Sequence, residues 1–354
     1  MLKITAPFKE TKEVSPLIAA GANELYCGYL SPAWVARYTS LEFERKGGAS
    51  SFTDLAELKQ AVNLAHKKGI PVYLALNGLY VRQQYPLLLE IIKQLSKVEL
   101  DGYIVADLGL LLILRDQGVR QEIHVSTGGT VFNSETARFY KNLGAGRVIL
   151  DRQTTLESMQ SISQENPDID FEVFILNTLC VYIDGYCTFL HAYPKDSIGD
   201  ISRKEWPEDQ KLQLLSTIDP EAMGDACKLQ YQVQVFGRGS GNKIDSDCAR
   251  PTFYKQLIDG AECGACALYD ITKTKIRSIK IVGRQLTSEI RLRSTEFIKN
   301  VLDILNNSKG ISRGDFICRV QKLYRETHHY SKICRGNNCY YPSALGKGGR
   351  RRSR

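Results

Sequence analysis

The sequence contains no long hydrophobic run. Its longest apolar stretch, around Leu108–Leu114, is much shorter than the roughly 20 apolar residues that a membrane-spanning helix needs. The chain also lacks a basic segment followed by an apolar core at its start, because Met1 leads directly into the alternating segment KITAPF. We therefore expect a protein that does not enter the membrane and that resides in the cytoplasm.

Several well-known catalytic and binding motifs are missing as well. No Gly-x-Ser-x-Gly nucleophile elbow, His-Glu-x-x-His zinc motif, Walker phosphate loop or DNA-reading helix module is present. No Gly-x-Gly-x-x-Gly follows the first predicted strand, which disfavours a doubly wound dinucleotide-binding sheet. A doubly wound open sheet is therefore the second choice of fold, and none of these motifs indicates a function.

The composition is that of an ordinary globular protein. The 354 residues are 43% hydrophobic and 24% charged, which suffices for one large domain or two smaller ones. The formal net charge is +8, and much of the excess lies in GKGGRRRSR, residues Gly346–Arg354. This basic tail is either a solvated end of the chain or an arm that binds the phosphates of RNA.

Short runs rich in β-branched and aromatic residues alternate with helical patterns along the chain. One helical pattern, Asp54–Gly69, has an acidic start and a Lys-Lys-Gly end, and Ser134 is expected to cap another helix. Strict alternation predicts parallel pairing, and eight such units predict an α/β fold closed into a (β/α)8 TIM-type barrel. The predicted strands are Lys3–Phe8, Glu24–Tyr29, Pro71–Asn77, Gly102–Asp107, Glu122–Thr127, Arg147–Asp151, Phe171–Leu176 and Ile276–Gly283.

The regular spacing of strands is interrupted once, between the seventh and the eighth. We expect barrel strands over residues 1–179, a cysteine-rich insertion over 180–275, the last strand and helix over 276–309, and an extension with the basic tail over 310–354. The insertion leaves the carboxyl-terminal end of a strand. Barrel enzymes place their chemistry at that face.

Cysteine is concentrated in the second half of the sequence. Disulfides are a poor explanation in a reducing cytoplasm, so the clustering favours a metal or an iron–sulfur cluster. Cys27 and Cys318 lie in apolar patterns and are predicted to be structural. The remaining eight are Cys180, Cys187, Cys227, Cys248, Cys263, Cys266, Cys334 and Cys339.

Three pairs of these cysteines are closely spaced. Cys180 and Cys187 flank a loop in which Gly185 is expected to allow a sharp turn. Cys263 and Cys266 have the compact spacing used for zinc and iron–sulfur ligation, although a redox dithiol has the same spacing. Cys334 and Cys339 form the third pair, and eight thiols would suffice for two four-thiolate sites.

The carboxyl-terminal ends of the predicted strands provide further candidates. Arg152 and Arg284 suit a small anionic co-substrate such as a dicarboxylate or a phosphate, unless they are ordinary surface arginines. His124 and Asp107 complete the predicted catalytic set; a buried structural histidine and a helix cap are the alternatives. Other polar side chains at these ends are Asn77, Ser126, Asp151, Asn177 and Lys280.

The segment EVFILNTLCVYIDGYC, residues Glu172–Cys187, resembles the signature of the peptidase U-32 (collagenase-like) family. That signature has Glu-x-Phe, a small pair, Leu-Cys, four residues and Gly-x-Cys; Asn177 and Thr178 stand at the small pair. The segments AAGANELYCG, ADLGLL, HVSTGGTVFN, GAGRVILDR and SIKIVGR agree in the same order, so the resemblance covers about residues 1–305. In the last of them, Val282 replaces an acidic residue.

The resemblance implies a barrel that carries a four-iron four-sulfur cluster. It also implies oxygen-independent hydroxylation of tRNA, rRNA or a ubiquinone precursor, with prephenate as the oxygen source in some members. Cys180, Cys187 and Cys227 are the implied ligands, and Cys266 is favoured as the fourth over Cys248 and Cys263. A second site would use Cys263, Cys334 and Cys339.

Three hypotheses about function follow. The first is an iron–sulfur hydroxylase or related redox enzyme acting on RNA or on a small aromatic or acidic substrate. The second is a peptidase, as the family name suggests, in which Cys27 and His124 would be the conceivable pair. The third is an RNA-binding protein whose cysteines hold zinc. A partner protein or a second copy of the chain is a further expected partner.

Overall fold

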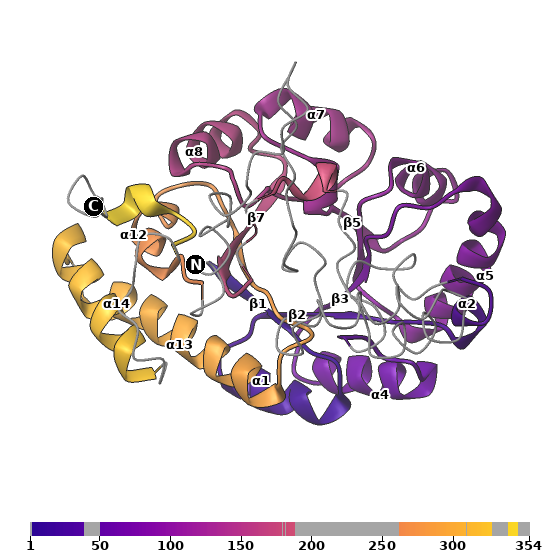
Figure 1. The fold of residues 1–354 in the computed structure, drawn as a ribbon, viewed down its shortest axis with the longest axis horizontal. Coiled ribbons are helices and arrows are strands. Elements are labelled where there is room, and N and C mark those ends of the chain that lie inside the picture. Colours follow the sequence, from indigo (N-terminus) through magenta and orange to yellow (C-terminus); the bar gives the residue numbers. More distant parts are fainter. Residues whose placement is uncertain are drawn as a thin grey trace, which may run out of the picture. The chain divides into compact units, whose positions relative to one another are not determined.

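A computed structural model describes residues 2–38, 50–178, 180, 182–187, 262–308, 310–327 and 339–345. Eight parallel strands close into a barrel in sequence order, which confirms the (β/α)8 prediction (Figure 1). Every strand begins and ends within two residues of its predicted run. The strands are β1 (Lys3–Pro7), β2 (Glu24–Gly28), β3 (Val72–Leu76), β4 (Gly102–Val105), β5 (Glu122–Val125), β6 (Arg147–Ile149), β7 (Asp170–Leu176) and β8 (Ser278–Ile281).

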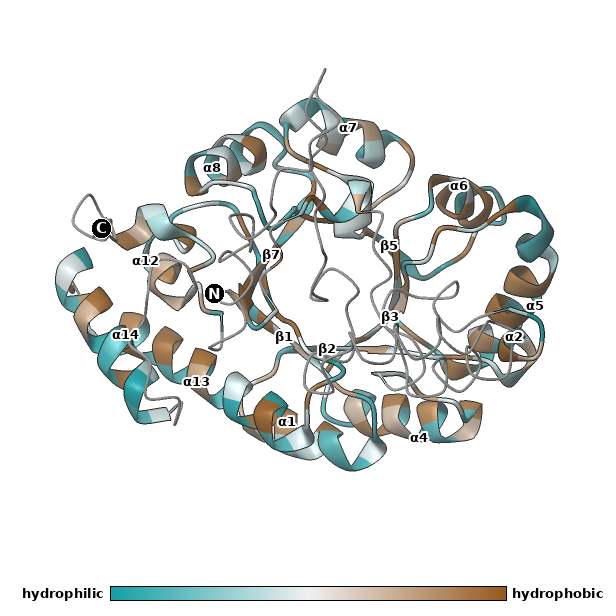
Figure 2. Cartoon of the chain, in the orientation of Figure 1, coloured by the Kyte–Doolittle hydropathy of each residue, from teal (hydrophilic) through white to brown (hydrophobic). Residues whose placement is uncertain are grey.

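Helices surround the strands, and several of them, such as α13 and α14, carry both apolar and polar residues (Figure 2). In α4, Leu58, Ala61, Val62 and Ala65 recur at helical spacing and are buried. The α-helices of the described residues are α1 (Val14–Ala19), α2 (Pro32–Val35), α4 (Leu55–His66), α5 (Tyr85–Leu95), α6 (Leu108–Asp116), α7 (Ser134–Asn142), α8 (Leu156–Glu165), α12 (Leu268–Ile271), α13 (Ser288–Asn307) and α14 (Arg313–Thr327).

The cap of α7 is one residue earlier than predicted. Asn133, not Ser134, has the extended backbone of a cap, and its side chain accepts a hydrogen bond from Thr136 N. Ser134 is already the first helical residue, and a capping side chain belongs to the residue just before the helix. None of the helices in the described ranges is long and apolar enough to cross a membrane.

Charged side chains occupy part of the barrel interior. Glu24 on β2 and Arg147 on β6 lie on strands that are not neighbours, so their contact crosses the barrel interior. Arg147 also contacts Glu172 on β7 at 3.2 Å, and Lys280 on β8 contacts the same carboxylate at 2.7 Å. Two carboxylates thus face two cations. Such pairing is necessary because an isolated buried charge is very costly.

The barrel unit includes both ends of the expected insertion. Residues Met1–Cys187 and Ala261–Arg354 belong to one compact unit. Within it, Cys263 forms a β-bridge with Leu176 at the end of β7, and Cys339 bridges Cys263 in turn. The expected insertion over 180–275 therefore packs with the barrel through its first and last residues, and residues 188–261 lie outside the described residues.

Candidate active site at the barrel mouth

The loop after β7 brings Cys180 and Cys187 to the carboxyl-terminal mouth of the barrel. Both thiols are partly buried. Burial raises the pKa of the Cys180 thiol, the Arg152 guanidinium opposes that rise, and the charge of Cys187 adds to it. The two thiols and Arg152 therefore share one electrostatic environment, and the structure groups three of the predicted site residues.

The residues that follow β6 hold this loop. Arg152 Nη1 donates to Thr178 O at 2.7 Å, and Gln153 Nε2 donates to Cys180 O at 2.6 Å. Arg152 Nε also lies 3.4 Å from a carboxylate oxygen of Asp184, which is inside the loop. The guanidinium of Arg152 therefore makes one hydrogen bond and one ion pair to the loop, while its buried Nε has no hydrogen-bond partner among the described residues.

Position 185 is occupied by glycine because a Cβ atom does not fit there. Its backbone is not left-handed, so the predicted sharp turn is not the reason for a glycine here. A Cβ at this position would lie 1.9 Å from Thr130 Oγ1 and 2.7 Å from Gly128 O. The loop can approach the segment after β5 this closely only because residue 185 has no side chain.

Asn177 and Thr178 connect β7 to the cysteine loop in an unusual conformation. Their φ angles are 64° and 51°, in the left-handed region that β-branched residues rarely enter. The side chain of Glu262 accepts from Thr178 N at 2.9 Å, and Tyr340 OH donates to Asn177 O. Surrounding residues thus hold a strained turn, which is a frequent property of functional sites.

The carboxyl-terminal cysteines lie on the other side of this turn. Because bridged residues on adjacent strands bring their side chains close, Cys339 lies beside Cys263. Cys263 Sγ accepts from Ala265 N at 3.4 Å, and the charge of Cys266 acts on Arg313 of α14. The structure thus brings Cys263 and Cys339 together, and the second site that would use them stays a prediction.

The complete ligand sets remain predictions. Cys227, Cys248 and Cys334 lie outside the described residues. Among the residues that are described, no three cysteine, histidine, aspartate or glutamate side chains form a group that could hold a metal ion. The structure accordingly places Cys180 with Cys187 and Cys263 with Cys339, and it does not join Cys266 to Cys180 and Cys187 in such a group.

Arg284 lies at the end of β8, on the same side of the barrel as Arg152. Both guanidinium charges act on the buried Tyr26 hydroxyl, with Arg284 having the larger effect. Lys280 Nζ lies 3.9 Å from the centre of the Tyr26 ring. Arg291 donates to Arg284 O at 2.9 Å and so fixes the turn that carries it. The guanidinium groups of Arg152 and Arg284 therefore act on one buried hydroxyl at the mouth, where the Asp184 carboxylate pairs with Arg152.

His124 is buried inside the barrel. Its ring packs against Tyr73 with 4.4 Å between the ring centres, and its Nε2 lies 3.0 Å from the carboxylate of Glu122, the first residue of β5. Burial lowers the pKa of His124 despite this carboxylate. The imidazole therefore points toward the amino-terminal end of its strand, away from the cysteine loop.

Asp107 caps α6, which was one of its two predicted roles. One carboxylate oxygen accepts from Leu110 N at 2.7 Å and from the Tyr85 hydroxyl, and the other accepts from Tyr80 N at 3.2 Å. These contacts satisfy a helix end and a neighbouring loop. They leave the catalytic prediction for Asp107 untested.

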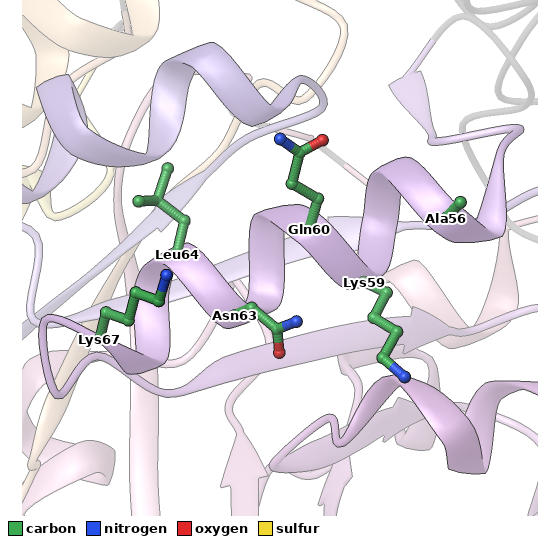
Figure 3. A pocket seen from close by; sticks show the side chains of 6 residues that line it. All are labelled: Ala56, Lys59, Gln60, Asn63, Leu64 and Lys67. Atoms are coloured by element: carbon green, nitrogen blue, oxygen red, sulfur yellow. The ribbon is translucent and has the colours of Figure 1, made fainter.

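A groove on α4 is unrelated to the predicted site. It is formed by side chains of this helix and of Lys67, the residue that follows it (Figure 3). None of the predicted catalytic or cysteine residues takes part in it. The lining residues are Ala56, Lys59, Gln60, Asn63, Leu64 and Lys67.

Comparison with known proteins identifies the family of the chain. The model of peptidase family U32 matches residues 9–200, more than half of the chain, including the loop with Cys180 and Cys187. The uncharacterized protease MJ0090 of Methanocaldococcus jannaschii is 31% identical over 93% of this chain and 72% of that protein. The chain belongs to peptidase family U32.

Two U32-related sequences have names that refer to RNA. The 23S rRNA 5-hydroxycytidine C2501 synthase of Escherichia coli is 24% identical over 97% of this chain and 45% of the synthase. The tRNA hydroxylation protein P of Haemophilus influenzae is 26% identical over 52% of this chain and 38% of that protein. This U32 chain thus spans less than half the length of either protein.

Several residues of the U32 mouth were not predicted from sequence. Gln153 directly follows Asp151 and Arg152, so its position after a strand was an available signal. Asp184 lies between the two predicted ligands Cys180 and Cys187, and this position was also an available signal. The contacts of Glu262 and Tyr340 with the turn after β7 join distant parts of the chain, and no local pattern indicates them.

Proposed function

We propose that this U32 protein hydroxylates RNA without molecular oxygen, using an iron–sulfur cluster at the barrel mouth and a small anionic co-substrate. The names of two relatives, which refer to 23S rRNA and to tRNA hydroxylation, support the RNA part. The observation in this chain that carries the proposal is the loop with Cys180 and Cys187, held beside Arg152 at the mouth.

The described part of the ligand set suits an iron–sulfur cluster. Thiolates are the usual ligands of such clusters, and two cysteine thiols with a shared electrostatic environment follow β7. A bound cluster would supply an iron centre for redox or Lewis-acid chemistry. Cys180 and Cys187 would hold it, with Cys227 and Cys266 as the proposed remaining ligands and Cys248 and Cys263 as alternatives.

A second cluster is proposed for the carboxyl-terminal cysteines. Cys263 and Cys339 lie side by side on bridged segments, and Cys334 is the third proposed ligand. Iron analysis separates one site from two, because four-thiolate clusters contain about four irons each.

The chain's own residues would bind and orient the co-substrate. Replacing a C–H bond of a base with C–OH removes two electrons from RNA, and a hydroxyl donor that becomes X–H supplies the oxygen and accepts those electrons. We propose a prephenate-like acid as this donor. Arg284, buried at the end of β8, would hold its carboxylate, since a guanidinium binds carboxylates with two parallel hydrogen bonds.

Anaerobic purification tests the cluster. We expect coloured protein with about four irons and matching sulfide, by the usual four-thiolate stoichiometry. Cys180→Ser and Cys187→Ser should each lose most of the iron, whereas Cys318→Ser, an exposed thiol on α14, should retain it. Zinc in place of iron would instead favour the zinc-bearing RNA-binding hypothesis.

Mass spectrometry of RNA nucleosides tests the activity. Cells that express the wild-type protein should contain a hydroxylated nucleoside that is missing in cells with Cys180→Ser and present with Cys318→Ser. Anaerobic growth should not abolish the product. Activity on peptides that survives complete removal of iron would contradict the proposal and favour the peptidase alternative.

A further inference from the structure

The turn after β6 contacts the cysteine loop on both sides of Cys180. This turn, Asp151–Gln153, binds the carbonyl of Thr178 before the cysteine and the carbonyl of Cys180 itself. It also accepts a hydrogen bond from the amide of Asp184 after the cysteine, at 3.3 Å to an Asp151 oxygen. The loop therefore cannot move relative to β6 without breaking at least one of these contacts.

Arg152 makes three contacts outside this turn. Its guanidinium lies 4.6 Å from the centre of the Phe174 ring, donates to Thr178 O and lies beside the carboxylate of Asp184. The side chain is only 12% exposed. A planar guanidinium can stack on a ring and donate in its own plane at the same time, and a lysine ammonium cannot.

We propose that Arg152 is a positioning residue for the cysteine loop, and that it does not bind the co-substrate. It fixes the backbone that leads into Cys180 and keeps a positive charge beside the thiols. This inference rests on the proposed function, because it assigns those thiols to a cluster. It revises the sequence-based prediction that Arg152 and Arg284 together hold the anion and leaves that task to Arg284.

The proposed charge has a direct electrochemical consequence. Reduction adds one negative charge to a cluster already surrounded by thiolates, and a nearby cation stabilises that reduced state. Removing the charge should shift the reduction potential to a more negative value. A substitution that keeps the positive charge but removes the contacts of Arg152 with the loop should instead loosen the loop and speed the loss of iron.

Variants at two positions separate these effects. Arg152→Gln removes the charge, Arg152→Lys keeps it without the planar geometry, and Gln153→Leu removes only the hydrogen bond to Cys180 O. Arg277→Gln is the matched control, because this 62% exposed arginine pairs with Asp170 at the start of β7, away from the mouth. The readouts are the reduction potential and the rate of iron transfer to a chelator, measured anaerobically on the loaded protein.

We expect Arg152→Gln to have a more negative potential and several-fold faster iron loss than Arg277→Gln. Arg152→Lys should keep a potential near that of the wild type while losing iron faster. Gln153→Leu, on the exposed side of the turn, should fold normally and also lose iron faster. The inference is overturned if a wild type that holds a cluster shows no difference between these variants and Arg277→Gln.

Failure of the proposed function would be visible separately. If the wild type binds no iron, alkylation of Cys180 by iodoacetamide in the metal-free protein still tests the positioning role. Arg152→Lys and Gln153→Leu, which both keep the positive charge that favours the Cys180 thiolate, should then react several-fold faster than Arg277→Gln. Equal alkylation rates in all variants would refute the positioning role itself.

Discussion

Arg147 of β6 and Glu24 of β2 meet through the middle of the barrel, with Nη1 2.6 Å from Oε2 and Nη2 2.9 Å from Oε1. This two-fold contact belongs to a buried group that also includes Thr5, Glu172 and Lys280. Barrel interiors are usually filled by branched apolar side chains. Here, hydrogen-bonded charges occupy part of that space, so the stability of the fold depends on their pairing.

Replacing one member of this pair should destabilise the protein strongly. Glu24→Gln leaves Arg147 with a weaker partner in a buried setting, and breaking a buried pair costs about 3–5 kcal/mol. Urea denaturation at neutral pH measures the free energy of unfolding. Lys12→Gln, which breaks an exposed pair with Glu10, should leave it almost unchanged, because solvent screens exposed charges. Equal effects of the two substitutions would refute the role of the pair.

The pair of Glu24 and Arg147 should make the stability of the protein sensitive to acid. Burial alone would raise the pKa of Glu24, but the hydrogen bonds and charge of Arg147 lower it to about 2 from an ordinary 4.5. A lowered folded-state pKa means that the stabilisation is complete above about 4.5 and is lost as the pH falls toward about 2. Wild-type unfolding free energy should therefore drop in this interval. In Glu24→Gln this part of the drop should be missing.

Gly185→Ala should displace the cysteine loop. The new Cβ would lie 2.7 Å from the backbone oxygen of Gly128, which cannot rotate away, and a core overpacked in this way typically loses about 1–3 kcal/mol. Gly146→Ala is the control, because nothing lies within 4 Å of its Cβ. The melting temperature and the iron content should both fall in Gly185→Ala and stay unchanged in Gly146→Ala. A stable, iron-loaded Gly185→Ala protein would contradict the close packing.

Thr178→Asn should stabilise the protein. Thr178 has a φ of 51°, and a β-branched residue in this region carries strain of about 1–3 kcal/mol, part of which asparagine relieves. The small pair of the family motif at this place agrees with a left-handed turn. Thr178→Val keeps the branch and should bring no gain. A lower melting temperature for Thr178→Asn than for Thr178→Val would rule out strain as the main effect.

Tyr341→Phe should weaken the attachment of the carboxyl-terminal segment. The buried Tyr341 hydroxyl donates to Phe174 O at 2.6 Å, and its removal leaves a buried carbonyl without that donor, at a cost of about 1–3 kcal/mol. Tyr38→Phe, whose hydroxyl makes an exposed hydrogen bond, should cost much less. Hydrogen exchange of Gly264, which donates to Ile175 O, should increase only in Tyr341→Phe.

Deleting residues 346–354 tests the predicted role of the basic tail. If this segment binds phosphates, the deletion should weaken RNA binding and reduce its dependence on salt, because fewer counterions are released. A fluorescently labelled RNA hairpin titrated at several salt concentrations measures both quantities. An unchanged salt dependence would identify the tail as a solvated end.

The sequence predicted the barrel well because strands and helices follow local patterns. Runs such as Glu122–Thr127 and Arg147–Asp151 are short and bounded, and parallel alternation restricts the topology to few solutions. The charged interior was not predicted. Glu24 and Arg147 stand at strand starts, where polar residues are ordinary, and only closure of the barrel brings them together.

The candidate site was predicted where its residues are close in sequence. Cys180 and Cys187 share one loop, and Arg152 and Arg284 follow strands whose ends meet at one mouth. The contacts of Arg152 with the loop were not visible, because they depend on backbone carbonyls that no residue type marks. Cys263 and Cys339 were placed together in a predicted second site, but only the bridges from β7 to Cys263 and from Cys263 to Cys339 show that the two residues are adjacent.

The contact between Tyr340 and Asn177 also sets an order of events during synthesis. The two residues are 163 positions apart and Tyr340 follows β8, so the turn that leads into Cys180 lacks this partner until all eight strands have been synthesised. The strands can associate earlier, since each neighbours the next in sequence. The cysteine loop is therefore completed late, and any cofactor would be inserted into a nearly finished protein.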